Sequence, residues 1–303
     1  AGNKTLPGQP LPPVKHHPSM PTLHRAIIVL ALLLFLSAAS LMVALGTGSL
    51  SIPPSDTLAI LGGADSPSRS IILDLRLPRA LAGFACGGLL ALAGALMQVL
   101  LRNPLADPYV LGISGGAGVG ALLAMLLGLA GIAIPGLAFI GALSAMFLVF
   151  GLAHGDGSWT QTRLLLTGVV ISAGCGAVVA LILTIAPEQK IQGMLFWLMG
   201  DLAQASNPFP PLILLAATLF SALPFARELN LLTRGEHQAV TLGVAVSRLR
   251  ILIYLIASLA TAGAVTAAGS IGFIGLIVPH LVRLAVGSNM GNDYRLLLPA
   301  VVL

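Results

Sequence analysis

The segment Arg76–Gly116 reads RLPRALAGFACGGLLALAGALMQVLLRNPLADPYVLGISGG and joins two arginines to a long apolar run and a glycine-rich end. Between Ala80 and Leu101 only Gln98 has a side chain with real hydrogen-bonding capacity, so about 22 residues can cross a hydrocarbon layer that needs roughly 20. Glycine and alanine recur along this run, and such small residues let neighbouring helices approach closely. The pattern predicts a membrane helix that lies inside a bundle rather than at its rim.

The composition of the whole chain indicates the same class. Its 303 residues are 57% hydrophobic and only 8% charged, whereas about 25% of the residues of a soluble domain are charged. The net charge of +5 comes from Lys and Arg that lie mostly outside the apolar runs, so it indicates topology and no nucleic-acid partner. We expect an all-α integral membrane protein, a polytopic helical bundle that contacts membrane lipid.

The apolar runs predict eight complete transmembrane helices and the start of a ninth. These runs cover 26–46, 80–101, 109–128, 131–152, 164–186, 209–226, 249–267 and 271–287, and another begins near Leu296. With the amino terminus in the cytoplasm, most Lys and Arg fall in cytoplasmic segments, as the positive-inside rule requires. The same topology puts Arg76 and Arg79 outside, so we expect a separate reason for these two arginines.

The chain divides into a flexible cytoplasmic tail at residues 1–24 and a single transmembrane domain at residues 25–303. Within the domain, the cytoplasmic segment 227–250 is longer than ordinary helix connectors, which have roughly 2–8 residues. Its apolar residues recur at helical spacing, and glycines interrupt them. We expect two short helices with a break, which together form a docking surface.

A short apolar piece, GMLFWLMG at residues 193–200, is too short to cross a membrane. We expect an amphipathic helix that lies at the membrane interface, with Trp197 at the depth of the lipid headgroups. The alternative is a turn of another transmembrane helix.

Two Arg-flanked spans resemble each other. One begins RLPRALAGFACGGLLALAGA at Arg76, and the other begins RLRILIYLIASLATAGAVTAAG at Arg248. Each continues into a segment with Gly and Pro, and the predicted topology sends the first inward and the second outward. An inverted repeat of this kind is typical of transporters.

Gly112, Gly116 and Gly120 are spaced four apart, which is the small-residue pattern for close contact between membrane helices. The same segment, GISGG, also fits a short nucleophile pattern around Ser114. A nucleophilic serine needs a base within hydrogen-bond reach, and His280 is the only plausible partner. An intramembrane serine hydrolase is therefore the alternative function from another class.

Several absences narrow the function. The chain contains no G-x-x-x-x-G-K-[ST] sequence, so it is not expected to bind nucleotide itself. No Cys and His residues have the spacing of a structural zinc site, and no metal site is predicted. Ionisable residues are nearly absent from the spans, unlike those of ion-coupled carriers. The pattern favours the membrane subunit of a pump whose ATPase is a separate chain.

Four blocks carry a resemblance to a known family. They are LRLPR (75–79), NPLADPYVLGISGGAG (103–118), LLTRGEHQAVTLGV (231–244) and GSIGFIGLIVPHLVRL (269–284). Together they resemble the FecCD-type permeases of bacterial ABC importers for iron chelates, haem and vitamin B12, from about residue 55 onward. The resemblance implies ten spans, so the last part of the protein would be absent from this sequence.

The resemblance also implies partners in the bacterial inner membrane. Such permeases work as homodimers with a pathway along the dimer axis, two cytoplasmic ATPase subunits that hold ATP and Mg²⁺, and a periplasmic binding protein. Arg76 and Arg79 match the arginines that pair with acidic residues on the two lobes of the binding protein. The residues that match the ATPase-coupling segment are Gly235, Glu236, Ala239, Leu242 and Gly243.

The remaining predicted sites surround the fifth span. By resemblance, Thr160, Gln161 and Thr162 match the cytoplasmic gate, although an N-cap for the helix near Arg163 is an equally good interpretation. The predicted pathway lining is Val169, Ser172, Ala173, Gly176 and Ala180. These small side chains offer no strong ligand, which suits a smooth tunnel for a bulky chelate.

The cargo is predicted from one short sequence segment. The segment AGSIGFIGLIVPH, residues 268–280, is nearer to haem and B12 permeases than to many siderophore permeases. We therefore predict haem as the cargo, with cobalamin and ferric siderophores as alternatives. No His or Tyr lies on the predicted pathway, so transfer would not need coordination of iron.

Overall fold

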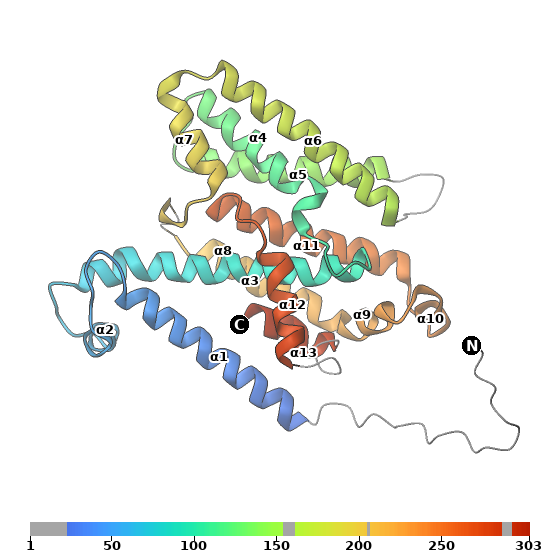
Figure 1. Cartoon of the computed structure of the whole chain (residues 1–303), viewed down its shortest axis with the longest axis horizontal. Coiled ribbons are helices and arrows are strands. Elements are labelled where there is room, and N and C mark those ends of the chain that lie inside the picture. The colour runs from blue at the N-terminus through green and yellow to red at the C-terminus, as the bar shows by residue number, and fades with distance from the viewer. Residues whose placement is uncertain (1–22, 154–160, 205–206, 287–292) are drawn as a thin grey trace, which may run out of the picture.

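The computed structural model describes residues 23–153, 161–204, 207–286 and 293–303, and all regular structure in these ranges is helical (Figure 1). The predicted tail at residues 1–24 lies almost entirely outside the described residues. Six of the described helical segments are long and apolar enough to cross a membrane. The prediction of an all-α, multi-pass membrane bundle is confirmed.

The helices follow one another with short connections. The first part of the chain forms α1 (Leu23–Gly46), α2 (Pro54–Leu61), the π-helix η1 (Ile71–Arg76), α3 (Leu77–Leu100), the 3-10 helix η2 (Pro108–Leu111), α4 (Ile113–Leu126), α5 (Ala133–Ala153) and α6 (Gln161–Ile185). The second part forms α7 (Glu188–Met199), η3 (Leu202–Gln204), α8 (Phe209–Ala222), η4 (Leu223–Phe225), α9 (Ala226–Thr233), α10 (Glu236–Thr241), α11 (Val246–Ala268), α12 (Ile274–Val286) and α13 (Tyr294–Val302).

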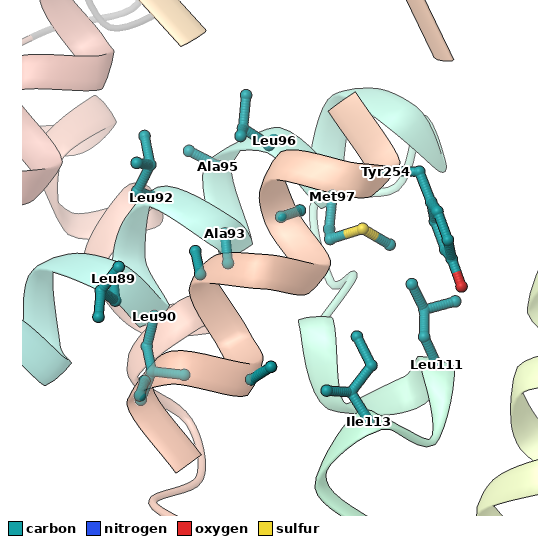
Figure 2. Packing of buried hydrophobic residues seen from close by; sticks show 14 of the residues in the cluster. Leu89, Leu90, Leu92, Ala93, Ala95, Leu96, Met97, Leu111, Ile113 and Tyr254 are labelled. Carbon is teal, nitrogen blue, oxygen red and sulfur yellow. The ribbon is translucent and has the colours of Figure 1, made fainter. Parts of the chain in front are cut away.

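Helix α3 lies at the centre of the bundle, as its small residues predict. It packs against α11, α12, α8 and α13, and 72% of its apolar span is buried, compared with 6% for α1 and 11% for α6. Figure 1 shows α3 and α11 running across the middle, with α4 to α7 on one side and α1 on the other. Figure 2 shows Leu89, Leu92 and Met97 of α3 among the buried residues, with Tyr254 of α11 nearby.

The glycines of α4 make the close contact that their spacing predicts. A Cβ atom built on Gly116 would lie 2.3 Å from the carbonyl oxygen of Gly141, and one on Gly120 would lie 2.0 Å from that of Leu137. Both oxygens belong to α5, so the α4 and α5 backbones touch. Gly112 has a different structural role: its left-handed backbone, with a φ of +75°, turns the chain from η2 into α4.

Two predicted spans have shorter helices than their apolar runs suggest. The run 109–128 contains η2 and α4, and the run 271–287 contains α12, which starts only at Ile274. The left-handed backbone at Gly112 separates η2 from α4, and a φ of +70° at Phe273 precedes α12. Both helices are too short to count among the six spanning ones. Hydropathy alone does not distinguish a helical turn from an irregular segment packed inside protein.

The helix predicted around GMLFWLMG exists as α7, and the side chain of Trp197, predicted at the depth of the lipid headgroups, is buried against other helices. Trp197 is 6% exposed and packs in the core of the bundle, and its carbonyl oxygen lies 2.6 Å from a Cβ atom built on Gly269. On the same helix, Lys190 Nζ donates to the carbonyl oxygen of Leu126 at the end of α4 over 2.9 Å. Tertiary contacts with α4 and the end of α11 therefore hold α7 in place.

Candidate docking and coupling surfaces

The two arginines predicted to dock a binding protein have different surroundings. Arg79, in the first turn of α3, is exposed and makes no hydrogen bond or ion pair within the described part of the chain. Arg76 is half-buried, and its guanidinium donates to the carbonyl oxygens of Leu45, over 2.7 Å, and Leu50. These bonds tie the start of α3 to the end of α1 and the chain that follows it. Arg79 is thus the arginine free to meet a partner.

The predicted coupling segment has the expected two helices. Gly235, with a φ of +131°, separates α9 from α10, and Gly243, with a φ of +84°, follows α10. Ala239 of α10 is fully buried, whereas Leu242, which directly follows α10, is 64% exposed. Val240 of the same helix is 56% exposed, so two apolar side chains lie open close together at α10, which suits a surface that a partner covers.

Glu236, the first residue of α10, connects this helix pair to the bundle. Its Oε2 accepts from Arg250 Nη2 over 2.7 Å, and the exposed fractions of the two side chains are 42% and 14%. Arg250 belongs to the first turns of α11, a helix that packs along α3. Glu236 therefore joins α10 to the central helices rather than lying free on the surface.

The predicted gate is only partly visible. Thr160 lies outside the described residues, Gln161 is the first residue of α6, and Thr162 is exposed. The alternative interpretation was an N-cap. Because α6 already begins at Gln161, the N-cap position is Thr160, so this alternative also lies outside the described residues.

The predicted pathway residues lie along one helix, α6. Val169, Ala173, Gly176 and Ala180 are spaced by four, three and four residues, so they share one face, and all four are exposed. A Cβ atom built on Gly176 would meet nothing within 4 Å. Ser172 differs, because it is half-buried and its backbone approaches Gly112 of the neighbouring turn.

The residues proposed for a hydrolase do not form a catalytic pair. Ser114 Oγ lies 2.9 Å from Ser270 Oγ, so its partner is another hydroxyl and not a base. His280 is exposed on α12 and makes no hydrogen bond with Ser114 in the described structure. The serine pair instead links the start of α4 to the segment between α11 and α12.

A polar network that sequence patterns did not predict lies at the carboxyl-terminal end of the central helix α3. Arg283 of α12 donates through Nη1 to Gln98 Oε1 of α3 and through Nη2 to Tyr294 Oη of α13, over 3.1 Å in the second case. Asn230 of α9 then contacts Asp293 and Tyr294 at the start of α13. The only sequence signal was Gln98, the single strongly polar residue of its span.

The comparisons with known proteins place this architecture in a family. The profile of the FecCD transport family matches residues 31–303. The chain belongs to the FecCD transport family. This membership agrees with the resemblance found in the four sequence blocks and with a transport protein rather than an enzyme.

Curated relatives in this family are permeases for several cargoes. The chain is 41% identical over 247 residues to the cobalamin import system permease protein BtuC of Halobacterium salinarum. This alignment covers 80% of this chain and 65% of the relative. It is 40% identical over 243 residues to the hemin transport system permease protein HmuU of Yersinia pestis, covering 77% and 71%. The ferric enterobactin permease FepD of Escherichia coli K12 is 40% identical over 286 residues, covering 92% and 84%.

A solved structure has the same fold. It is described as an inward-facing conformation of an ABC transporter assigned to the metal-chelate type, and it superposes with a TM-score of 0.79 at 30% identity. The match covers 91% of this chain and 86% of that chain. Nearly all of the described bundle therefore has a counterpart in an ABC transporter.

Proposed function

We propose that this chain is the membrane permease subunit of an ATP-driven importer that receives its cargo from a periplasmic binding protein. The observation that carries the proposal is that the bundle has a FecCD fold with a separate helix pair, α9 and α10, whose Leu242 is 64% exposed. Such a helix pair can seat on an ATPase subunit and convert its closure into rotation of attached helices. ATP and Mg²⁺ would be held by that ATPase.

The assembly proposed for this subunit is a homodimer with two ATPase subunits in the inner membrane, with the amino terminus in the cytoplasm. One face of α6 supports this proposal, because its side chains are exposed when the chain is alone. This stripe consists of Val169, Ala173, Gly176 and Ala180. A second copy placed against α6 would enclose a pathway between the two stripes. Small apolar side chains there would let a bulky cargo pass without being retained.

Docking of the loaded binding protein would occur at the other side of the membrane, at Arg79. Its exposed guanidinium can form bidentate hydrogen bonds with a carboxylate of the partner. Because the bond to a flexible exposed side chain is screened by salt, docking through this group should weaken at high ionic strength.

We propose haem as the cargo. The sequence of residues 268–280 supports this choice. The relatives named for hemin, cobalamin and ferric enterobactin are 40%, 41% and 40% identical, so their identities do not discriminate between the three cargoes. The test is ATPase stimulation of the complex in lipid vesicles by binding proteins loaded with haem, cobalamin or a ferric siderophore. Strongest stimulation by the haem-loaded protein is expected. Stimulation by another cargo alone would overturn the haem assignment and keep the importer.

A further inference from the structure

Asn230 on α9 holds the first turn of α13 with both ends of its side-chain amide. Its Nδ2 donates to Asp293 Oδ1 over 2.7 Å, and its Oδ1 accepts from the backbone N of Tyr294 over 2.8 Å. Asp293 Oδ1 also accepts from the backbone N of Arg295 over 3.0 Å, which caps α13. A planar amide bonded at both ends fixes the position of α9 against α13.

Arg283 carries the connection onward from α13. Its two terminal nitrogens donate to Tyr294 Oη and to Gln98 Oε1, and it makes no ion pair with any residue that the structure describes. A half-buried guanidinium has lost part of its water, so losing either acceptor leaves a charged donor unsatisfied. Movement of α13 is therefore expected to pull α12 and α3 with it.

Gln98 completes the connection at the core. It is 5% exposed near the end of α3, and its Nε2 lies 3.5 Å from the carbonyl oxygen of Leu276 on α12. One turn earlier on α3, the backbone at Gly94 touches the backbone of Gly275 on α12. The polar chain thus runs from α9 through α13 and α12 to the most buried helix of the bundle.

Helix α3 joins this chain to the proposed docking site. Arg79 lies in its first turn and Gln98 in its last turn, and its 24 residues span about 36 Å. Because the helix is packed on several sides along its apolar span, a displacement at one end is carried to the other.

We propose that Gln98, Arg283, Tyr294, Asp293 and Asn230 form a polar relay through which docking at Arg79 is communicated to the helix pair α9 and α10. This inference rests on the proposed importer function and deepens it by naming positioning residues. Their role is to make α3, α12, α13 and α9 move together, which supplies coupling between two distant surfaces.

The sharpest test exchanges the two ends of the amide contact. In Asn230→Asp, two carboxylates face each other across the bond. In the double variant Asn230→Asp with Asp293→Asn, the amide nitrogen at position 293 can donate to the carboxylate at position 230, and that carboxylate keeps an acceptor for the backbone N of Tyr294. Because Asp293 Oδ1 accepts from both Asn230 and the backbone N of Arg295, the cap at Arg295 requires the new amide to turn. The control is Asn103→Asp, since Asn103 accepts only a local bond from Leu105 N and is exposed.

The measurement is ATPase activity of the complete complex in vesicles, with and without the loaded binding protein. In Asn230→Asp, the stimulation should fall about tenfold, as expected when a charge-assisted bond is lost, while basal ATPase and co-purification of the subunits stay unchanged. The double variant should recover part of the stimulation, because it restores a donor and an acceptor between positions 230 and 293, and Asn103→Asp should keep it. Full stimulation in Asn230→Asp would overturn the relay, and so would an equal loss of basal and stimulated activity that the double variant does not restore.

A second pair of variants tests the Arg283 link. Tyr294→Phe removes only the hydroxyl that accepts from Arg283, whereas Tyr254→Phe removes a buried hydroxyl that donates to the Met146 carbonyl oxygen over 2.9 Å. Stimulation should fall in the first variant and persist in the second, with unchanged affinity for the binding protein in both. Equal stimulation in the two variants would overturn the relay. A wild-type complex that no loaded binding protein stimulates would instead refute the importer function.

Discussion

Gly94 of α3 and Gly275 of α12 bring two helix backbones into direct contact. A Cβ atom built on Gly94 would lie only 1.8 Å from the carbonyl oxygen of Gly275. Pro279 lies one turn further along α12 and has no N–H group, so it cannot form the helical bond to that carbonyl. The crossing thus places a carbonyl that lacks its helical donor against a residue without a side chain.

Gly94→Ala should therefore destabilise the protein strongly. The added methyl meets backbone, which cannot change rotamer, so the loss should exceed the roughly 1–3 kcal/mol typical of overpacked cores. The measurement is the thermal midpoint of the detergent-solubilised protein. Gly87→Ala is the matched control on the same helix, because a Cβ atom there meets nothing within 4 Å, and it should leave the midpoint unchanged or raise it. A tolerated Gly94→Ala would contradict the crossing.

Arg79 and Arg76 should respond differently to substitution. Arg79→Glu should weaken binding of the loaded binding protein by tenfold or more, without changing the thermal midpoint, because its side chain is exposed and makes no described contact. Arg76→Ala should lower the thermal midpoint, since the two carbonyl oxygens it contacts lose a charged donor. Binding affinity and thermal midpoint separate the two roles. Unchanged affinity in Arg79→Glu would refute docking at this residue.

The exposed stripe on α6 should face its counterpart in a second copy. In a variant with Cys86 and Cys175 replaced by Ala, a cysteine introduced at Ala173 or Ala180 should be joined to the partner copy by a short bifunctional maleimide. A cysteine at Val43 of α1, which is 61% exposed, is the control and should remain monomeric on a denaturing gel. Efficient cross-linking at Val43 with none at Ala173 or Ala180 would place the dimer interface elsewhere.

The ion pair between Glu236 and Arg250 should hold α10 in position for its partner. Glu236→Ala should weaken binding of the ATPase subunit, and the change in free energy should be about 1 kcal/mol because Glu236 is 42% exposed and water screens the pair. Exchanging the two residues in Glu236→Arg with Arg250→Glu should restore part of the affinity. Glu188→Ala, an exposed glutamate of α7, should have no effect. The same loss in both single variants would argue against a specific role.

Much of the fold could be predicted from the sequence because small residues and apolar length encode it directly. The spacing of Gly116 and Gly120 predicted the contact between α4 and α5, and the glycine-rich run before Gln98 predicted the central helix. The burial of Trp197 among other helices had no signal in the sequence, because an apolar helix fits lipid and protein equally well. The positive φ of Phe273, a non-glycine residue, leaves no signal in the sequence.

The candidate sites were less predictable than the fold. Arg76 bonds to backbone carbonyl oxygens, which every residue has, so no pattern identifies its partners. The partner of Gln98 lies 185 residues away in the chain, and a single sequence contains nothing that joins the two. Only the fold brings the parts of the polar relay together.

In the proposed function, this chain forms the membrane pathway of an ATP-driven importer. The most direct measurement is accumulation of haem in sealed vesicles that contain the chain with its ATPase subunits, with haem-loaded binding protein on the docking side and ATP on the other. Accumulation should require both ATP and the binding protein and should fall in Arg79→Glu. Vesicles in which the assembled complex hydrolyses ATP but accumulates neither haem, cobalamin nor a ferric siderophore would contradict it.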